Sequence, residues 1–317
     1  MAKHPNEEFR RLIKNLNEKE GFKKNLYPRQ EHRKISWPEY NFSKINELKE
    51  VLTIVKEFVN EVDCPRDKGV GRPSVNPKVL AKAIFFCELV GLPERQAQGW
   101  LEIIGPFLGI HEKLDDRVIG EGYNRLDVLM ILQKVFYKTK ISDGKLGGDG
   151  SGLERSRKEN YESTKKKNAG RYMTSIVDSR EIVQAFDISG TQECQIMHEL
   201  IKDVEGDSLR LDAGFNDKNL AMEIANKRMV PYIYLKKNNN MNGNLYWQEM
   251  CYKFYNDLVA WLINYHQRSH TESFHSAFKR KFGIITKLRF NCKFVQVCAR
   301  IILHNISRIS YFKRLQH

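Results

Sequence analysis

The spacing of apolar residues changes near Lys140, and this change limits the folds open to the chain. Before it, apolar residues recur every three or four positions, as in residues 43–62, which is typical of amphipathic helices. After it, residues 145–153, 172–177 and 181–188 have the pattern of three successive strands. The sequence therefore predicts a helical region followed by a region that contains a sheet.

The region after residue 140 continues as alternating helices and strands. Two helices and two strands are expected, at 191–204, 208–212, 217–228 and 231–235. Strands followed by helix–strand alternation are the pattern of an α/β domain with a mixed sheet. We predict two domains, an all-helical one in residues 1–139 and an α/β one in residues 140–317.

The helical region contains a candidate helix-turn-helix around residues 76–103. Asn76 can cap a helix that has Pro77 at its first position and that Gly91 ends. A second short helix is expected over 93–103, joined to the first by a tight turn that contains glycine. A further helix is expected over 124–137, with Leu126, Leu129, Leu132 and Phe136 on its apolar face.

Charge indicates the kind of partner. The 317 residues include 53 Lys and Arg against 39 Asp and Glu, a net charge of +14. Such an excess opposes compaction by self-repulsion, so we expect the protein to bind a polyanion, with nucleic acid the first candidate. A hydrophobic content of 41% supplies a core, and 20 Gly and 9 Pro are too few for a fibrous or wholly disordered chain.

Targeting signals and cysteine usage indicate the compartment. No stretch approaches the roughly 18 apolar residues of a membrane span, and the opening residues lack the apolar core of a signal peptide. The six cysteines are scattered rather than paired, as in a protein with reduced thiols. We expect a soluble cytoplasmic protein.

Two aspartates stand where an α/β sheet usually carries function, at the carboxyl ends of strands. Asp149 lies within GGDGSG, whose glycines allow a ligand to approach the backbone closely. Asp212 ends the strand SLRLD and is followed by Ala-Gly-Phe. Aspartate is also common in turns and helix caps, so each residue alone has an ordinary structural explanation.

A polar stripe is expected on a helix over residues 261–282. Tyr265, Arg268, Glu272 and Lys279 are spaced by three, four and seven positions, which places them on one side of a helix. An exposed face held by the Arg268–Glu272 pair would have the same pattern. Because other faces supply apolar residues for burial, this stripe is free to face a site.

These motifs together resemble a known family. The Tyr, Arg, Glu and Lys spacing is similar to the YREK signature of DDE transposases from bacterial and archaeal insertion sequences. Asp-Ala-Gly-Phe at 212–215 resembles the second-aspartate motif of that group, and DGSG at 149–152 resembles the first. The resemblance covers about residues 140–307, including His-Asn at 304–305, and extends more loosely to GRP at 71–73.

The resemblance implies an RNase H-like fold that brings Asp149, Asp212 and Glu272 together as catalytic residues and metal ligands. It implies Mg²⁺ or Mn²⁺ as cofactor, with two ions. The reaction would free a 3′-hydroxyl at a transposon end and join it to target DNA. Partners would be double-stranded DNA, namely terminal inverted repeats and target DNA, and a second copy of the chain in a homodimer associated with the nucleoid.

DNA contacts are expected from both domains. Residues 1–139 are expected to recognise the terminal repeat, because metal chemistry at a phosphodiester does not distinguish bases. The expected DNA-binding residues are Arg72, Arg95, Gln96, Tyr265, Arg268, Lys279, Arg280 and Lys281.

Several alternatives remain at this stage. Asp143 is a rival to Asp149, and His266, His270 and His275 have partial metal-ligand spacing without an HExxH pattern, so we interpret them as polar residues near DNA. Asp217 is best explained as a helix cap. A metal-dependent nuclease without strand transfer, or a non-catalytic DNA-binding protein derived from a transposase, would keep most of these features.

Overall fold

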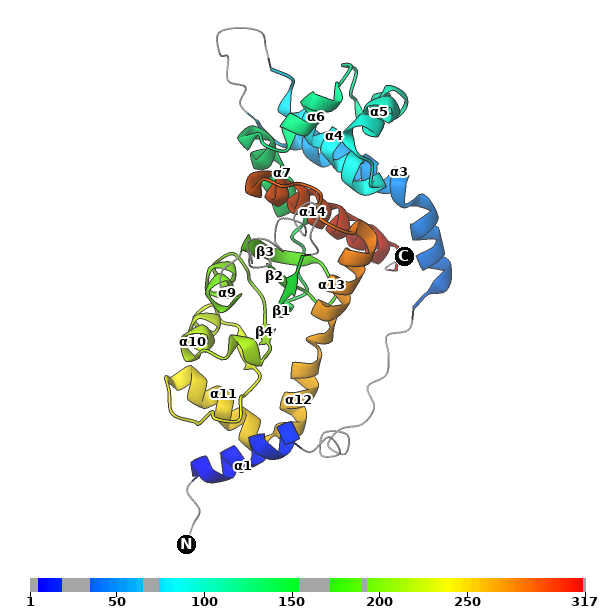
Figure 1. The fold of residues 1–317 in the computed structure, drawn as a ribbon. Coiled ribbons are helices and arrows are strands. Elements are labelled where there is room, and N and C mark those ends of the chain that lie inside the picture. Colours follow the sequence, from blue (N-terminus) through cyan, green and yellow to red (C-terminus); the bar gives the residue numbers. More distant parts are fainter. Residues whose placement is uncertain (1–4, 19–34, 65–73, 154–171, 190–192, 316–317) are drawn as a thin grey trace. The chain divides into compact units, whose positions relative to one another are not determined.

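A computed structural model describes residues 5–18, 35–64, 74–153, 172–189 and 193–315 (Figure 1). The chain divides into two compact units, and neither is continuous in sequence. The first unit combines Met1–Lys34, Ser142–Gly152 and Arg171–His275; the second combines Ile35–Ile141, Leu153–Gly170 and Ser276–His317. The predicted division into residues 1–139 and 140–317 therefore has to be corrected at both ends of the chain.

The first unit is built on a mixed five-stranded sheet, which confirms the predicted α/β class. Its strands are β1 (Lys145–Gly152), β2 (Tyr172–Val177), β3 (Val183–Ser189), β4 (Ser208–Leu211) and β5 (Val230–Ile233). Their order is β3-β2-β1-β4-β5, with β1 antiparallel to β2 and parallel to β4. β2 and β3 are antiparallel, and β4 and β5 are parallel. Every strand predicted from the sequence is present.

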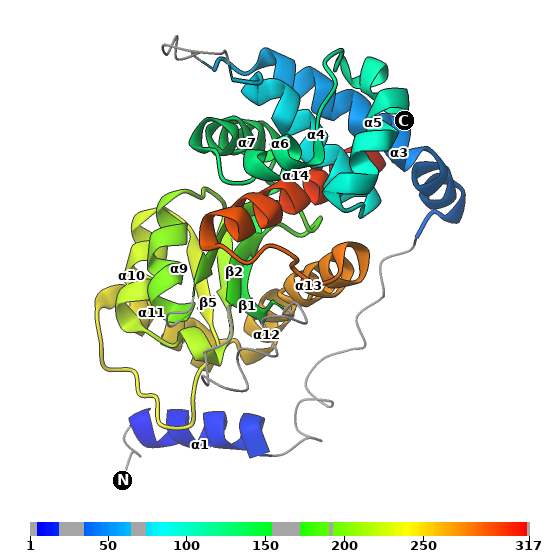
Figure 2. The same cartoon turned by 45° about the horizontal axis from the view of Figure 1, so that its top comes forward.

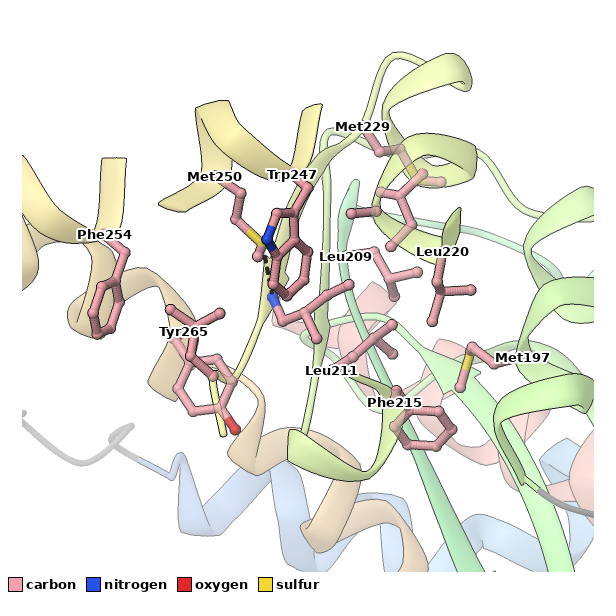
Figure 3. Close-up of a cluster of buried hydrophobic side chains, with 14 of the residues drawn as sticks. Met197, Leu209, Leu211, Phe215, Leu220, Met229, Trp247, Met250, Phe254 and Tyr265 are labelled. Atoms are coloured by element: carbon pink, nitrogen blue, oxygen red, sulfur yellow. Dashed lines mark hydrogen bonds between the residues drawn. The ribbon is translucent and has the colours of Figure 1, made fainter. Parts of the chain in front are cut away.

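Helices cover both faces of this sheet (Figure 2). One face carries α9 (Glu193–Lys202), α10 (Lys218–Asn226) and α11 (Leu245–Asn256), and the other carries α12 (Leu258–His266) and the start of α13 (Ser269–Phe282). Side chains from the sheet, α10 and α11 meet in a buried apolar cluster (Figure 3). Members of this cluster include Leu209, Leu211, Phe215, Leu220, Trp247 and Met250.

The central strand β1 is rich in glycine because helices approach it closely from both faces. A side chain at Gly147 would lie 2.6 Å from Thr271 Oγ1 of α13, and one at Gly148 would lie 2.7 Å from Met197 Cε of α9. Glycine has low strand propensity, but here the absence of a side chain is what allows the helices to pack. This packing explains a central strand with few β-branched residues.

The N-terminal helix α1 (Pro5–Glu18) belongs to the first unit and was not predicted. Phe9, Ile13 and Leu16 are buried in the apolar cluster, and the Phe9 and Phe254 rings meet edge to face at 5.8 Å. Apolar residues spaced four and three apart fit one helical face, although the surrounding Lys, Glu and Asn hide the pattern. α1 is thus part of the α/β unit, although it lies in the region predicted to form the helical domain.

The described part of the second unit is helical. It contains α3 (Trp37–Glu61), α4 (Pro77–Val90), α5 (Glu94–Leu108), α6 (Asp116–Gly122), α7 (Leu126–Thr139) and α14 (Phe290–Arg314). The predicted caps of α4 are confirmed, since the Asn76 side chain accepts a hydrogen bond from Lys78 N and Gly91 is left-handed with φ of 75°. None of the helices in the described residues is long and apolar enough to cross a membrane.

A buried polar network explains why the C-terminal helix α14 joins this unit. The Glu88 carboxylate on α4 accepts hydrogen bonds from Tyr123 Oη at 2.7 Å and from Arg300 Nε of α14 at 2.6 Å. Gln296 Nε2 donates to the same carboxylate at 3.0 Å. A buried carboxylate requires such partners, so α14 satisfies a charge that would otherwise be left in the helical core.

Two expectations about helices are corrected. In α7 the buried face is Val128, Ile131, Leu132 and Val135, whereas Leu126 is 71% exposed. The helix expected over 261–282 is instead two helices, α12 and α13, separated at Gln267 and Arg268.

Candidate active site

Asp149 and Asp212 are neighbours across two parallel strands. Gly148 of β1 is in register with Leu211 of β4, so the two aspartates occupy the next pair of positions, where β4 ends and β1 continues to Gly152. Residues opposite each other in parallel strands point to the same face, and here that face is the one covered by α12 and α13. The expected approach of the two acids is thus a consequence of strand register.

The break between α12 and α13 places Arg268 beside two of the catalytic candidates, Asp149 and Glu272. Its guanidinium donates to Asp149 Oδ2 at 3.2 Å and to Glu272 Oε1 at 2.5 Å. The helical stripe expected from the sequence is therefore interrupted, because Tyr265 lies in the last turn of α12 whereas Glu272 lies in the first turn of α13. The backbone crosses the break through turns in which Arg268 N donates to Tyr265 O and Thr271 N donates to Arg268 O.

A fourth carboxylate, Glu193, was missed by the sequence analysis. It lies in the first turn of α9, and a side chain at Gly150 would collide with its carboxylate group. Its own pKa is raised by burial and by the nearby charges of Asp149 and Asp212. The glycine after Asp149 is the one sequence signal of this approach, and it does not say which residue approaches. We call Asp149, Glu193, Asp212, Glu272 and Arg268 the acidic site.

Electrostatics in the acidic site disfavour an uncompensated set of charges. Burial raises the pKa of Asp149, Arg268 opposes this shift, and the adjacent Asp212 adds to it. The Glu272 side chain is 61% exposed, whereas those of Asp149 and Arg268 are 18% and 15% exposed. Arg268 thus supplies part of the positive charge that a cluster of carboxylates requires.

The donor atoms of the acidic site fit a hard divalent cation. All four acidic side chains offer carboxylate oxygens, which Mg²⁺ and Mn²⁺ prefer, and the group contains no thiolate or imidazole. One carboxylate oxygen of Asp212, Oδ1, accepts a hydrogen bond from Gly214 N at 2.7 Å, so Oδ2 is the oxygen that remains for a metal ion. Asp149, Asp212 and Glu272 are the residues that would hold metal ions, with Glu193 at the edge of the group.

Tyr265, one of the expected DNA-binding residues, is buried. The side chain lies in the apolar cluster (Figure 3), stacked on Trp261 with ring centroids 5.3 Å apart. Burial raises its pKa to about 12, and a hydrogen bond connects its side chain to Arg268. Tyr265 therefore helps to orient Arg268.

The basic residues expected on α13 differ in their surroundings. Arg280 is exposed and Lys279 is half-buried. Lys281 is held inside the helical unit, where its Nζ lies 2.6 Å from Glu47 and 3.0 Å from Ser307 Oγ. The Lys281 ammonium is thus held by an ion pair and a hydrogen bond within the helical unit, and Lys281 is not among the proposed DNA contacts.

The residues expected to read DNA lie on α5 or outside the described residues. Gln96 is exposed, and the Arg95 side chain is 90% exposed while it pairs with Asp116 at 3.1 Å. Arg72 lies outside the described residues, as does the basic run between residues 154 and 171.

The remaining candidates have structural roles. His270 and His275 are buried, with His270 against Gly147 and His275 Nε2 3.4 Å from Ser175 Oγ. Both side chains therefore contribute to packing, and the expectation that they lie near DNA stays a prediction. Asp143 precedes β1 and bonds to Ser179, at the end of the strand opposite to Asp149. Asp217 caps α10, as expected.

No protein-family model, curated protein sequence or solved structure matches the chain.

Proposed function

We propose that the protein is a DDE transposase of the insertion-sequence type, with Asp149, Asp212 and Glu272 as its metal-binding catalytic residues. The single observation that carries this proposal is the geometry of the acidic site. Strand register makes Asp149 and Asp212 neighbours, and Arg268 joins Asp149 to Glu272. The mixed sheet is compatible with the RNase H-like fold that the motifs imply.

Two of the three proposed ligands are held on rigid elements. Asp149 lies within β1 and Asp212 directly follows β4, so the sheet hydrogen bonds fix their separation. Glu272 enters from the first turn of α13, whose position depends on the contact between Thr271 and Gly147. Bound Mg²⁺ would supply charge stabilisation at the attacking and leaving oxygens of a phosphodiester.

Arg268 has two functions in this proposal. Without metal or DNA, its guanidinium limits the repulsion among the carboxylates. With DNA bound, it can hold a phosphate of the cleaved strand, because a guanidinium forms paired hydrogen bonds to phosphate oxygens. The hydrogen bond with Tyr265 keeps the side chain directed at the site.

The net charge of +14 supports DNA as the substrate. Lys279 and Arg280, on the same helix as Glu272, are proposed to extend the phosphate contacts. Arg95 and Gln96 at the start of α5 remain the described candidates for reading bases in the helical unit, and Arg72 remains a candidate from the sequence alone.

The test uses the purified full-length chain and a labelled duplex that carries the short inverted repeats flanking its gene. With Mg²⁺ and a target plasmid, we expect a new 3′-hydroxyl at the repeat end and a product joined to the target. Asp212→Asn and Glu272→Gln should lose both products and keep DNA binding. Cleavage without joined product would identify a nuclease, and binding without cleavage by the wild-type chain would identify a non-catalytic DNA-binding protein.

A further inference from the structure

A second group of metal-ligating side chains lies between α9 and the start of α10. Cys194 and His198 are four residues apart on α9, and Asp217 is the N-cap residue of α10. One ligand atom from each residue lies within 4.8 Å of the ligand atoms of the other two. We call these three residues the thiol cluster.

The imidazole of His198 is oriented from outside the thiol cluster. Its Nδ1 lies 2.7 Å from Glu223 Oε2 on α10, whereas its Nε2 lies 3.5 Å from Asp217 Oδ2. Histidine ligands of metals commonly bond a carboxylate through the ring nitrogen that does not bind the metal. The geometry therefore leaves Nε2 directed at Asp217.

The carboxylate of Asp217 is oriented in a similar way. Its Oδ1 accepts the capping hydrogen bond from Asn219 N at 2.7 Å. Its Oδ2 is the oxygen that faces His198. Cys194, His198 and Asp217 are all partly exposed, so an ion from solvent has access to them.

We propose that Cys194, His198 and Asp217 bind one Zn²⁺ ion, at a site distinct from the acidic site. Thiolate, imidazole and carboxylate are the three ligand types that Zn²⁺ takes in proteins, and a water molecule would complete four-coordination. The thiol proton of Cys194 passes to solvent on binding. A set with one thiolate does not suit Mg²⁺, which selects oxygen.

The ion would link two segments that also carry the acidic site. Cys194 directly follows Glu193, and Asp217 ends the short segment that begins at Asp212. A bond from each of these segments to one ion would hold the first turn of α9 against residues 212–217. The site is thus structural, and it does not depend on whether the acidic site cuts DNA.

The test measures metal binding by the full-length chain, freed of metal with a chelator, using Zn²⁺ alone and then Co²⁺ as a spectroscopic substitute. We expect one Zn²⁺ per chain that Mg²⁺ in excess does not displace. With Co²⁺ we expect the ligand-to-metal charge-transfer absorption that a thiolate ligand gives. The acidic site cannot produce this absorption, because it contains no sulfur.

Conservative variants assign the ligands. Cys194→Ser and His198→Gln should remove the bound ion, and Asp217→Asn, which keeps a good helix cap, should weaken binding. Glu223→Gln should weaken it by about 10–100-fold, because it removes only the group that orients His198. Cys292→Ser, at another half-buried cysteine, is the matched control and should bind as the wild type does.

Two results would overturn the proposal. One is a cobalt complex without thiolate absorption, and the other is Zn²⁺ affinity unchanged in Cys194→Ser and His198→Gln. Either would leave His198 as an imidazole between two carboxylates, with Cys194 taking no part.

Discussion

The acidic site and the thiol cluster both take residues from the start of α9 and from residues 212–217, yet their chemistry differs. The acidic site gathers two aspartates from neighbouring strands and two glutamates from helices, and it is neutralised in part by Arg268. The thiol cluster gathers three different ligand types on two helices and is oriented by Glu223 and a helix cap. Under the two proposals, the neighbouring residues Glu193 and Cys194 would serve ions of different hardness.

The largest difference is expected from one substitution made in each region. Asp149→Asn should reduce DNA-end cleavage by at least about 1,000-fold, because it removes a metal-ligand charge that is worth several kcal/mol in the transition state. For Asp217→Asn, the same change in the thiol cluster, the rate of DNA-end cleavage should stay within about 10-fold of the wild-type rate. The measurement is single-turnover cleavage of labelled repeat ends at saturating protein. Equal losses in both variants would mean that the two regions form a single site.

The next effect concerns the buried imidazole beneath the acidic site. Burial lowers the pKa of His270 to about 4, and its Nε2 has no hydrogen-bond partner among the described residues. Above about pH 6.5 the side chain is neutral in both folded and unfolded chains. Below that pH the unfolded chain binds a proton that the folded chain excludes, so the free energy of unfolding should fall until about pH 4, by up to about 3 kcal/mol.

Urea unfolding at a series of pH values between 7 and 4 tests this expectation. His270→Gln should flatten the decline in the free energy of unfolding, since glutamine does not titrate. An identical decline in wild type and His270→Gln would assign the acid sensitivity to other groups.

A smaller effect is expected at Arg268. Arg268→Gln should reduce cleavage by about 10–100-fold, because it removes a charge-assisted phosphate contact and leaves Asp149 harder to ionise. The salt dependence of DNA binding should become shallower by about one unit of slope. Lys202→Gln removes one positive charge from the surface of the same unit and is the matched control. A salt slope unchanged by Arg268→Gln would place this side chain away from DNA.

The smallest effect is expected at Glu193, the carboxylate of the acidic site that directly precedes Cys194 in the chain. Glu193→Gln should reduce cleavage only a few-fold at saturating Mg²⁺, with a higher Mg²⁺ concentration required, because three carboxylates remain. Glu199→Gln, at an exposed glutamate on the same helix, should cleave DNA at the wild-type rate and with the wild-type Mg²⁺ requirement. If Glu193→Gln abolished cleavage at every Mg²⁺ concentration, the set of essential ligands would have to include Glu193.

The strands and their order of appearance could be predicted because their signals are local. The capping pattern of α4 and the strands β2 and β4 follow from residues within a few positions of one another. The adjacency of Asp149 and Asp212 could be anticipated, since the ends of parallel strands meet at one edge of a sheet. The break at Gln267 and Arg268 could not, because no proline or glycine marks it and the periodicity continues across it.

Features that depend on distant partners were missed. Glu193 and the thiol cluster are assembled from α9 and the segment before α10, and no recognised spacing connects them. The unit boundary was placed wrongly because α1 and α14 each pack on elements far away in sequence. Arg300 pairs with Glu88, and Phe9 with Phe254, so neither contact has a local signature.

The docking of α1 has a consequence for how the protein is made. Phe9 leaves the ribosome early, whereas its ring partner Phe254 is synthesised 245 positions later (254 minus 9). The helical unit likewise waits for Arg300 before the charge on Glu88 is matched. Neither core can close until most of the chain has been made, and contacts so distant in sequence slow folding. A ribosome-bound chain that ends near residue 240 should therefore be digested readily by protease. In an expression host with limited chaperone capacity, we expect a larger fraction of the protein to aggregate.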